Sequence, residues 1–240
     1  MTNCIKSIFV SMLAAFFVLT MVSLSAAMPV TYNFESLSTG NLIGQDGWVN
    51  IGGTNMTVSV DPLFNGSKIA GTPGSATSNF AERTNDDSFS YTSFSGNETD
   101  AYLQYDVRVN RHGNDQSHFL LGSGGVTSSP QMGVEGFNFM IRKANGGAVH
   151  LASIPVSINA NDWVQVRMYM DLTSNVGDGF GSLYYKNLTQ GETSFTSITG
   201  LQNKSLGMNV TGVDPTAWDT IIMRTGFLSE STMDNLTVST

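Results

Sequence analysis

Cysteine is almost absent from this sequence of 240 residues, which contains only Cys4. That residue precedes an apolar stretch near the N-terminus, and positions 28–240 contain no cysteine. This absence excludes a disulfide framework, a zinc–thiolate site and a cysteine nucleophile from residues 28–240. A domain without such crosslinks depends for its stability on a hydrophobic core, alone or together with a bound metal ion.

Charged residues are also scarce and make up 12% of the chain. The 11 Lys and Arg residues are outnumbered by 19 Asp and Glu residues, so the formal net charge is −8 at pH 7. An acidic chain does not attract a phosphate backbone, and nucleic acid is therefore not an expected partner. Ser, Thr, Asn and Gly dominate instead. Such a neutral polar surface suits polyhydroxyl ligands and cation chelation, and it also suits solubility.

The N-terminal segment Met1–Ala27 has the layout of a secretory signal peptide. Lys6 is followed by the apolar stretch Ile8–Leu24 and then by small residues, with Ser25 and Ala27 at the −3 and −1 positions of a cleavage site. We expect cleavage after Ala27 and a secreted protein, extracellular or periplasmic, with no membrane span after cleavage. The alternative is a retained transmembrane anchor.

Helical periodicity is hard to find after residue 27, whereas alternation of apolar and polar residues recurs. It is clearest in Ala101–Val109 and Trp163–Thr173, and Phe137–Arg142 shows it over a shorter length. Strands of this kind bury one face and expose the other, as in antiparallel sandwiches. The sequence predicts an all-β fold, a two-sheet antiparallel β-sandwich (jelly roll).

Shorter β-like runs are separated by clusters of Gly, Asn, Asp and Ser, which favour turns. No proline-rich or charged linker divides the chain, so we expect a single domain over residues 28–240. The runs are Val30–Glu35, Met56–Val60, Phe89–Phe94, Ser117–Leu121, Ala148–Ile154, Ser182–Asn187, Thr220–Met223 and Met233–Val238.

Three segments carry a family resemblance: YNFESLSTGNLIGQDGW at 32–48, DWVQVRMYMDL with the following GSLYYKNL at 162–188, and STMDNLTVS at 231–239. Together they resemble the opening strand, central hairpin and closing strand of concanavalin A-like lectin/glucanase (laminin G-like) domains. Galactose-binding-type carbohydrate modules share the opening and closing segments. The resemblance implies a secreted, non-catalytic, lectin-like protein whose partner is a polysaccharide or glycan. A structural or adhesive surface protein is a further alternative.

The same scaffold also supports glycoside hydrolases and polysaccharide lyases. Related glucanases carry a Glu-X-Asp-X-X-Glu strand, and none of the six glutamates here has that neighbourhood. The related lyases use Arg, Gln, His and Tyr from one sheet, although the sequence motifs that surround those residues are missing. For this chain the resemblance suggests Arg108, Gln104, His118 and either Tyr184 or Tyr185.

The polar faces of the two best-defined strands are the candidate ligand-binding surface. Gln and Arg can bond paired sugar hydroxyls, and Tyr can offer an aromatic face to sugar C–H groups. The alternative is an ordinary solvated sheet on which Arg108 pairs with Asp106 or Asp171. The candidate binding residues are Tyr102, Gln104, Arg108, Gln165, Arg167 and Tyr169.

A structural calcium ion is a further expectation. If the first and last strands pair, Glu35 and Asp234 approach each other, and carbohydrate-binding sandwiches of the resembling kind hold calcium in this way. The alternative is two exposed carboxylates at strand ends. The segment Asp171–Gly181 has oxygen-bearing side chains but does not fit an EF-hand, and we interpret it as a long hairpin turn.

The three tryptophans, Trp48, Trp163 and Trp218, are expected to pack in the core rather than to stack on sugars.

Overall fold

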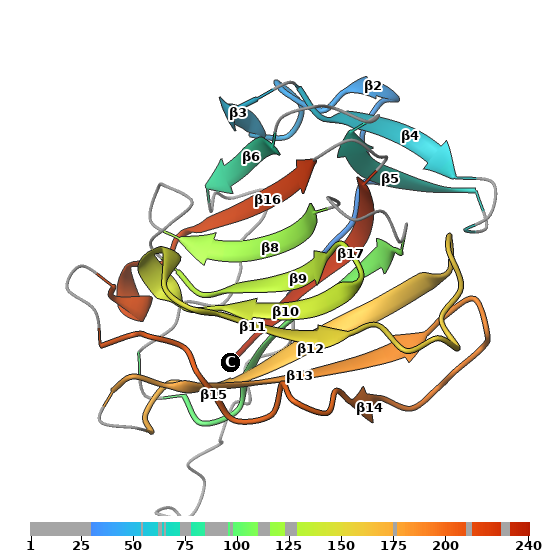
Figure 1. The fold of residues 1–240 in the computed structure, drawn as a ribbon. Coiled ribbons are helices and arrows are strands. Elements are labelled where there is room, and N and C mark those ends of the chain that lie inside the picture. Colours follow the sequence, from blue (N-terminus) through green and yellow to red (C-terminus); the bar gives the residue numbers. More distant parts are fainter. Residues whose placement is uncertain are drawn as a thin grey trace, which may run out of the picture.

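A computed structural model places two antiparallel sheets face to face, so the predicted all-β sandwich is confirmed (Figure 1). The structure describes residues 30–53, 55–61, 64, 66–72, 78–84, 96, 98–109, 116–122, 129–174, 177–209, 213–226 and 231–240. The predicted signal peptide and the predicted strand Phe89–Phe94 lie outside these residues. Within the described part, no helix is both long enough and apolar enough to cross a membrane.

The larger sheet has ten strands among the described residues, and eight of them form a continuous path. β1 adds to β17 beside this path, and β15 adds to β13. In spatial order the path is β14 (Thr196–Ser197), β13 (Phe180–Asn187), β12 (Trp163–Asp171), β7 (Ala101–Arg108), β17 (Ser231–Ser239), β5 (Ser67–Thr72), β4 (Thr57–Asp61) and β2 (Gly40–Asn41); β1 is Val30–Tyr32 and β15 is Lys204–Ser205.

The smaller sheet has seven strands in the described part of the chain, and two short 3-10 turns complete the regular structure. In spatial order the strands are β11 (Val149–Ser153), β10 (Asn138–Arg142), β9 (Gln131–Glu135), β8 (Gln116–Gly122), β16 (Thr220–Gly226), β6 (Ser78–Thr84) and β3 (Val49–Gly52); the turns are η1 (Ala144–Gly146) and η2 (Pro215–Ala217).

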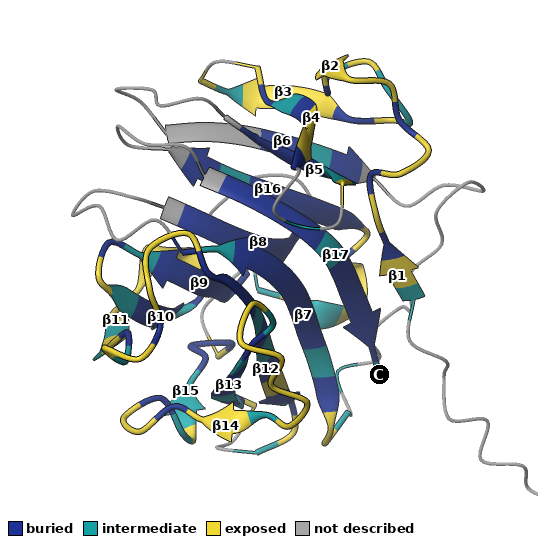
Figure 2. Cartoon of the chain, turned by 90° about the vertical axis from the view of Figure 1, so that its right-hand side faces the viewer, coloured by how far each residue is buried: buried dark blue, intermediate teal, exposed yellow. Residues whose placement is uncertain are grey.

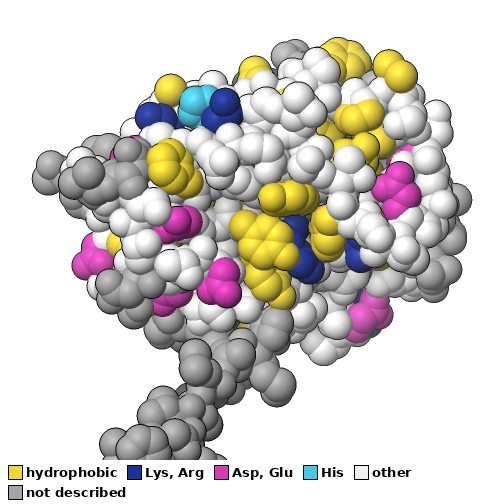
Figure 3. Space-filling view, turned by 90° about the horizontal axis from the view of Figure 1, so that it is seen from below, with side chains coloured by type: hydrophobic (Ala, Val, Ile, Leu, Met, Phe, Trp, Pro, Cys, Tyr) yellow, Lys and Arg dark blue, Asp and Glu magenta, His cyan; other side chains and the backbone are white. Residues whose placement is uncertain are grey.

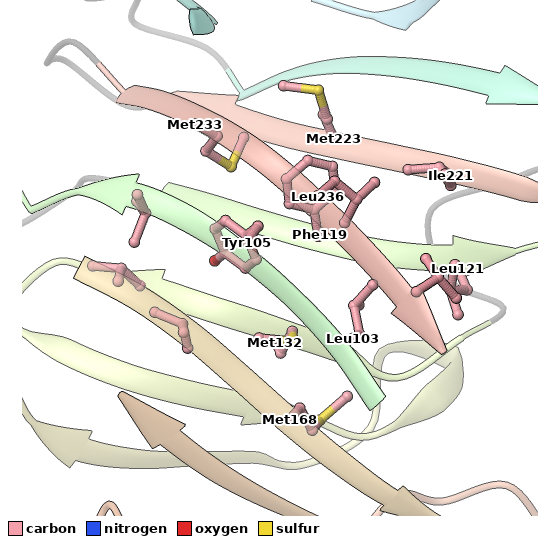
Figure 4. Close-up of a cluster of buried hydrophobic side chains, with 14 of the residues drawn as sticks. Leu103, Tyr105, Phe119, Leu121, Met132, Met168, Ile221, Met223, Met233 and Leu236 are labelled. Atoms are coloured by element: carbon pink, nitrogen blue, oxygen red, sulfur yellow. The ribbon is translucent and has the colours of Figure 1, made fainter. Parts of the chain in front are cut away.

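The core lies between the sheets and is built from the inward face of each strand. On β7 and β12 this face is the apolar half of the alternation, which confirms the predicted pattern. Burying these side chains removes apolar surface from water, which is the main favourable contribution to folding. Leu103, Met168 and Met233 from the larger sheet face Phe119 and Met132 from the smaller one (Figure 4).

One polar contact crosses this apolar core. Tyr105 of β7 is fully buried, and its hydroxyl donates a 2.7 Å hydrogen bond to the backbone oxygen of Ser117 in β8. Gly133 of β9 lies against the same contact. A Cβ atom at Gly133 would stand 2.2 Å from the Ser117 oxygen and 2.8 Å from the Tyr105 hydroxyl. Only a residue without a side chain fits there.

All three tryptophans are buried, and Trp48 and Trp218 pack in the core as expected. Trp48 donates from Nε1 to the Tyr32 hydroxyl at 3.0 Å. Trp163 lies on the opposite side of its sheet from the core, where Phe64 stacks on it with ring centroids 4.3 Å apart. Tryptophan therefore contributes to packing in this fold, including packing outside the space between the sheets.

Burial differs from the sequence-based prediction at Phe137, where the predicted alternation over Phe137–Arg142 begins and puts this residue on one face with Phe139 and Ile141. Phe137 lies in the turn between β9 and β10, and 52% of its surface is exposed, while Phe139 and Ile141 are buried. The alternation continued one residue beyond the strand. Figure 2 shows the dark core strands β7, β8, β16 and β17 and the exposed strands β2, β3 and β14.

Candidate functional site

The strand register brings the predicted binding residues onto one face of the larger sheet. β12 pairs antiparallel with β7, so that Tyr169 lies opposite Tyr102, and Arg167 lies opposite Gln104. Arg167 also lies opposite Tyr184 of β13. These side chains point away from the smaller sheet, and we call this side the outer face. Two strands about 60 residues apart in sequence thus present one continuous surface.

Arg167 is held at the middle of this surface by two hydrogen bonds. Its Nε donates to Gln104 Oε1 at 2.7 Å, and its Nη1 donates to the Tyr169 hydroxyl at 2.8 Å. The guanidinium carbon also lies 4.5 Å from the Tyr102 ring centroid and 4.3 Å from that of Phe195. Both distances are within cation–π range. The guanidinium position is therefore fixed by its neighbours.

Four aromatic side chains gather around Arg167, and we call them the aromatic patch: Tyr102, Tyr169, Tyr184 and Phe195. Tyr169 meets Tyr102 and Tyr184 edge to face, with centroids 5.7 and 5.5 Å apart. Tyr169 is 36% exposed, and the other three are partly exposed. Figure 3 shows apolar side chains next to Lys and Arg atoms near the middle of this view. The patch offers ring faces and hydroxyls to a ligand.

Phe195 was missed by the sequence analysis. It lies between β13 and β14 in a segment without alternation, and it reaches the surface because β14 pairs with Tyr184 and Tyr185. Lys186 Nζ lies 5.0 Å from the Phe195 centroid, so Phe195 contacts two cations. An aromatic residue in a polar segment, TQGETSF, was the available signal.

The outer face is not uniformly solvated, which corrects the prediction for its middle. Gln104 is only 8% exposed and Asp106 only 2%. Gln165 Nε2 donates to Asp106 Oδ1 at 2.7 Å, and Asn235 Nδ2 donates to Asp106 Oδ2 at 2.8 Å. Burial raises the pKa of Asp106, and these two hydrogen bonds partly offset that rise. The amide of Gln165 is engaged with Asp106.

Arg108 lies apart from the aromatic patch, six residues along β7 from Tyr102, which corresponds to roughly 20 Å. It forms an ion pair with Asp61, with 3.4 Å between Nη1 and Oδ2. Trp163 Nε1 also donates to that carboxylate, at 3.3 Å. The ion pair described for Arg108 is thus with Asp61, which is neither of the partners, Asp106 and Asp171, named in the alternative. The six predicted binding residues therefore divide into an Arg167 group, the Gln165–Asp106 pair and a separate Arg108.

Asp171 caps a turn, in keeping with the interpretation of its segment as a hairpin turn. Its carboxylate accepts hydrogen bonds from the backbone and hydroxyl groups of Thr173 and Ser174. These bonds lower the pKa of Asp171. Residues 175–176 of the turn lie outside the described part.

Glu35 and Asp234 approach each other as expected, because β1 does pair with β17. The Ser67 hydroxyl lies between them: it contacts Glu35 Oε1 and is 3.0 Å from Asp234 Oδ2. A hydroxyl carries one hydrogen and cannot donate to both carboxylates at once. Asp234 is fully buried, and its Oδ1 has no hydrogen-bond partner of normal geometry among the described residues. Burial, with repulsion from Asp106 and Glu35, raises the pKa of Asp234 to about 6.

This arrangement matches a cation site only in part. Glu35, Asp234 and Ser67 supply oxygen ligands, and the unpartnered buried oxygen of Asp234 is one that a cation would satisfy. However, no group of three or more His, Cys, Asp and Glu side chains in the described segments is arranged to hold a metal ion. Any calcium here would need further oxygen ligands from the backbone or water.

The residues suggested by the lyase resemblance do not form one group. His118 lies on β8 of the smaller sheet, while Gln104, Arg108 and Tyr184 lie on the outer face of the larger sheet. Tyr185 points inward into the core.

His118 has its own polar neighbours on the smaller sheet. It is fully buried and lies opposite Arg224 of β16 in the register. Burial and then the charges of Arg224 and Arg142 hold the pKa of His118 well below its usual value of 6.5. Gln131 and the Val134 backbone favour the charged form, but neither imidazole nitrogen has a hydrogen bond of normal geometry. The imidazole is therefore neutral at pH 7.

Comparison with known proteins gives matches among solved structures alone: no protein-family model and no curated protein matches the chain. The chain is similar to a botulinum neurotoxin type C structure described by its interaction with two ganglioside molecules, with 15% identity and a TM-score of 0.48. That match covers 80% of this chain and 42% of the toxin chain, so the chain spans less than half of the neurotoxin chain.

Two further matches cover nearly the whole of both chains. A carbohydrate esterase of the Shiga toxin-encoding bacteriophage phi24B is 13% identical, covers 88% of this chain and 98% of its own, and has a TM-score of 0.48. A protein of unknown function from Shewanella oneidensis MR-1 is 12% identical, covers 94% and 93%, and has a TM-score of 0.46.

Proposed function

We propose that this chain is a secreted, non-catalytic carbohydrate-binding protein of the concanavalin A-like kind, and that the aromatic patch binds the glycan. The observation that carries the proposal is the patch itself, in which partly exposed rings surround a fixed guanidinium. Sugar rings present C–H faces that pack on aromatic side chains and hydroxyls that need planar hydrogen-bonding groups. Tyr169, Gln104 and Arg167 supply both kinds of contact, and they are already positioned by one another.

The first prediction concerns Tyr169, the most exposed member of the patch. In a protein shown to bind a polysaccharide on an array, we expect Tyr169→Ala to weaken binding at least tenfold, about 1.4 kcal/mol, because a ring face and a hydroxyl are lost. Calorimetric titration with an oligosaccharide of the bound glycan measures the change.

Phe137→Ala is the matched control, because it also removes an exposed ring but from the smaller sheet. It should leave the affinity unchanged. If Phe137→Ala weakened binding and Tyr169→Ala did not, the glycan site would lie on the smaller sheet. If no polysaccharide bound the wild-type protein, a structural or adhesive role would replace binding as the proposed function.

A structural calcium ion at Glu35, Ser67 and Asp234 is a further part of the proposal, supported by the unpartnered buried oxygen of Asp234. We expect Ca²⁺ to raise the melting temperature of EDTA-treated protein. At ten times its dissociation constant a ligand that binds only the folded state contributes about 1.4 kcal/mol. Scanning calorimetry with Ca²⁺, with Mg²⁺ and with EDTA measures the effect.

Asp234→Asn should abolish the calcium effect, whereas Asp214→Asn, a change at an exposed carboxylate, should preserve it. An equal Ca²⁺ response in Asp234→Asn and wild type would exclude this site. A response to Mg²⁺ as large as that to Ca²⁺ would point to general charge screening.

A second candidate function, polysaccharide lyase, is favoured by one observation on the smaller sheet. His118 is a neutral imidazole with Gln131, Arg142 and Arg224 as its neighbours, but it is fully buried, so a lyase role would require its neighbours to move and expose it to the substrate. A lyase base removes the proton next to a uronate carboxyl group, the C–O bond to the leaving sugar breaks as a C=C bond forms, and the leaving oxygen takes a proton from water. The same polysaccharide screen, read by ultraviolet absorbance of unsaturated uronates, decides between the two functions.

A further inference from the structure

Two cations border the aromatic patch without an ion-pair partner among the residues that the structure describes. Arg83, Arg108 and Arg142 each have a carboxylate oxygen within 4 Å, at Asp46, Asp61 and Glu135 respectively. By contrast, among the described residues neither Arg167 nor Lys186 forms an ion pair. The difference is notable in a chain of net charge −8, in which acidic residues outnumber basic ones.

Both cations retain free hydrogen-bond donors. A guanidinium has five N–H donors, and Arg167 uses one for Gln104 and one for Tyr169. The ammonium of Lys186 has three donors and makes no hydrogen bond within the described residues; its contact is with the ring of Phe195. Arg167 and Lys186 are both partly exposed. Their free donors are therefore accessible to a ligand that rests on the patch.

The two cations lie on neighbouring strands beside the same ring. Arg167 of β12 and Lys186 of β13 approach the Phe195 centroid to 4.3 and 5.0 Å. The nearest carboxylate in the strand register is Asp106, which lies opposite Gln165, the partner of Lys186. Asp106 is buried and accepts hydrogen bonds from Gln165 and Asn235; burial raises its pKa and the charge of Lys186 lowers it, but Asp106 and Lys186 form no ion pair.

We propose that the glycan bound here carries an acidic group, a carboxylate or a sulfate ester, that is recognised by Arg167 and Lys186. This inference rests on the proposed carbohydrate-binding function and names the class of glycan. Arg167 is suited to the planar oxygens of a carboxylate, and Lys186 adds a point charge.

The experiment uses pairs of polysaccharides that differ in the acidic group alone: uronate polymers with their carboxyl-reduced forms, and sulfated galactans with their desulfated forms. The full-length protein is tested on an array of these pairs. We expect binding to the acidic member of a pair and at least tenfold weaker binding to its neutral form. The uronate and sulfate pairs separate the two sources of negative charge.

Lys186→Met tests the residue, with Lys204→Met as the matched control at another partly exposed lysine. Lys186→Met should weaken binding to the acidic glycan at least fivefold and leave binding to any neutral glycan unchanged, and Lys204→Met should change neither. Equal binding to both members of each pair would contradict the inference of an acidic ligand and leave the proposed glycan site intact. The same conclusion would follow if Tyr169→Ala abolished glycan binding and Lys186→Met did not. Binding to no glycan would overturn both proposals.

Discussion

Replacing Gly133 by alanine is expected to destabilise the protein by at least about 3 kcal/mol, toward the upper end of the usual cost of overpacking. The added Cβ would stand 2.2 Å from the Ser117 backbone oxygen and 2.8 Å from the Tyr105 hydroxyl. Backbone in the middle of a sheet cannot move aside cheaply. The strands must therefore separate, and the buried hydrogen bond from Tyr105 to Ser117 is lost with them.

Gly146→Ala provides the control for Gly133→Ala. Gly146 has a φ of +68° and no atom within 4 Å of the added Cβ, so its cost comes from backbone strain alone, about 1–2 kcal/mol. Urea unfolding followed by tryptophan fluorescence compares the two variants. Equal losses in both would show that the contact between Tyr105 and Ser117 adjusts to a methyl group.

A loss of stability on mild acidification is the second large expected effect, and it arises from His118. The folded state holds the pKa of this imidazole well below 6.5, while the unfolded chain has the ordinary value. A depressed pKa in a base means that protonation favours the unfolded state. The contribution of neutral His118 to the free energy of unfolding is thus fully present above pH 6.5 and is lost as the pH falls below that value. At pH 5 this loss is at most about 2 kcal/mol.

Other charged groups face His118, and their effects on the pH dependence of stability must be distinguished from the effect of His118. Arg224 of β16 and Arg142 of β10 oppose its protonation, while Glu135 of β9 lies near both arginines. Burial raises the pKa of three carboxyl groups, those of Asp106, Asp234 and Glu82. Their contributions to the free energy of unfolding therefore rise as the pH falls. The informative quantity is therefore the difference between wild type and His118→Gln in free energy of unfolding, measured at pH 7.5 and at pH 5.

His150→Gln is the control for this measurement, because His150 is only partly buried beside Lys143 and Lys204 and its pKa is lowered less. We expect the pH-dependent difference to be large for His118→Gln and small for His150→Gln. A His118→Gln variant that followed the wild-type pH profile would contradict the neutral buried state of this imidazole.

The long strands were predictable because each buries a single face. Ala101–Arg108 and Trp163–Asp171 alternate cleanly, and the same alternation put the candidate binding residues on one surface. The strands β5, β6 and β9 were not predicted, since polar residues interrupt their apolar pattern and β5 and β9 also contain glycine, as in the QMGVE of β9. In such strands, neighbours in space rather than periodicity fix the conformation.

The burial of Asp106 was beyond the reach of the sequence for a related reason. Periodicity places this residue on the outer face, but it does not show which side chains lie around it there. Asn235 has a φ of +49° at a register shift in β17, and its amide reaches Asp106 from that irregular position. The joint position of Phe195 and Arg167 likewise depends on a long-range pairing between β13 and β14.

The central place of β17 in the larger sheet has a consequence for the order of folding. Its residues 231–239 pair with β7, β5 and β1, and the hydroxyl contact between Thr31 and Thr237 joins positions 206 residues apart. During synthesis on the ribosome, β1, β5 and β7 therefore emerge long before their shared partner. Closing such long loops makes folding slow, and the unpaired edges are prone to aggregation until residues 231–239 emerge. The larger sheet thus stays incomplete for most of the translation of the chain.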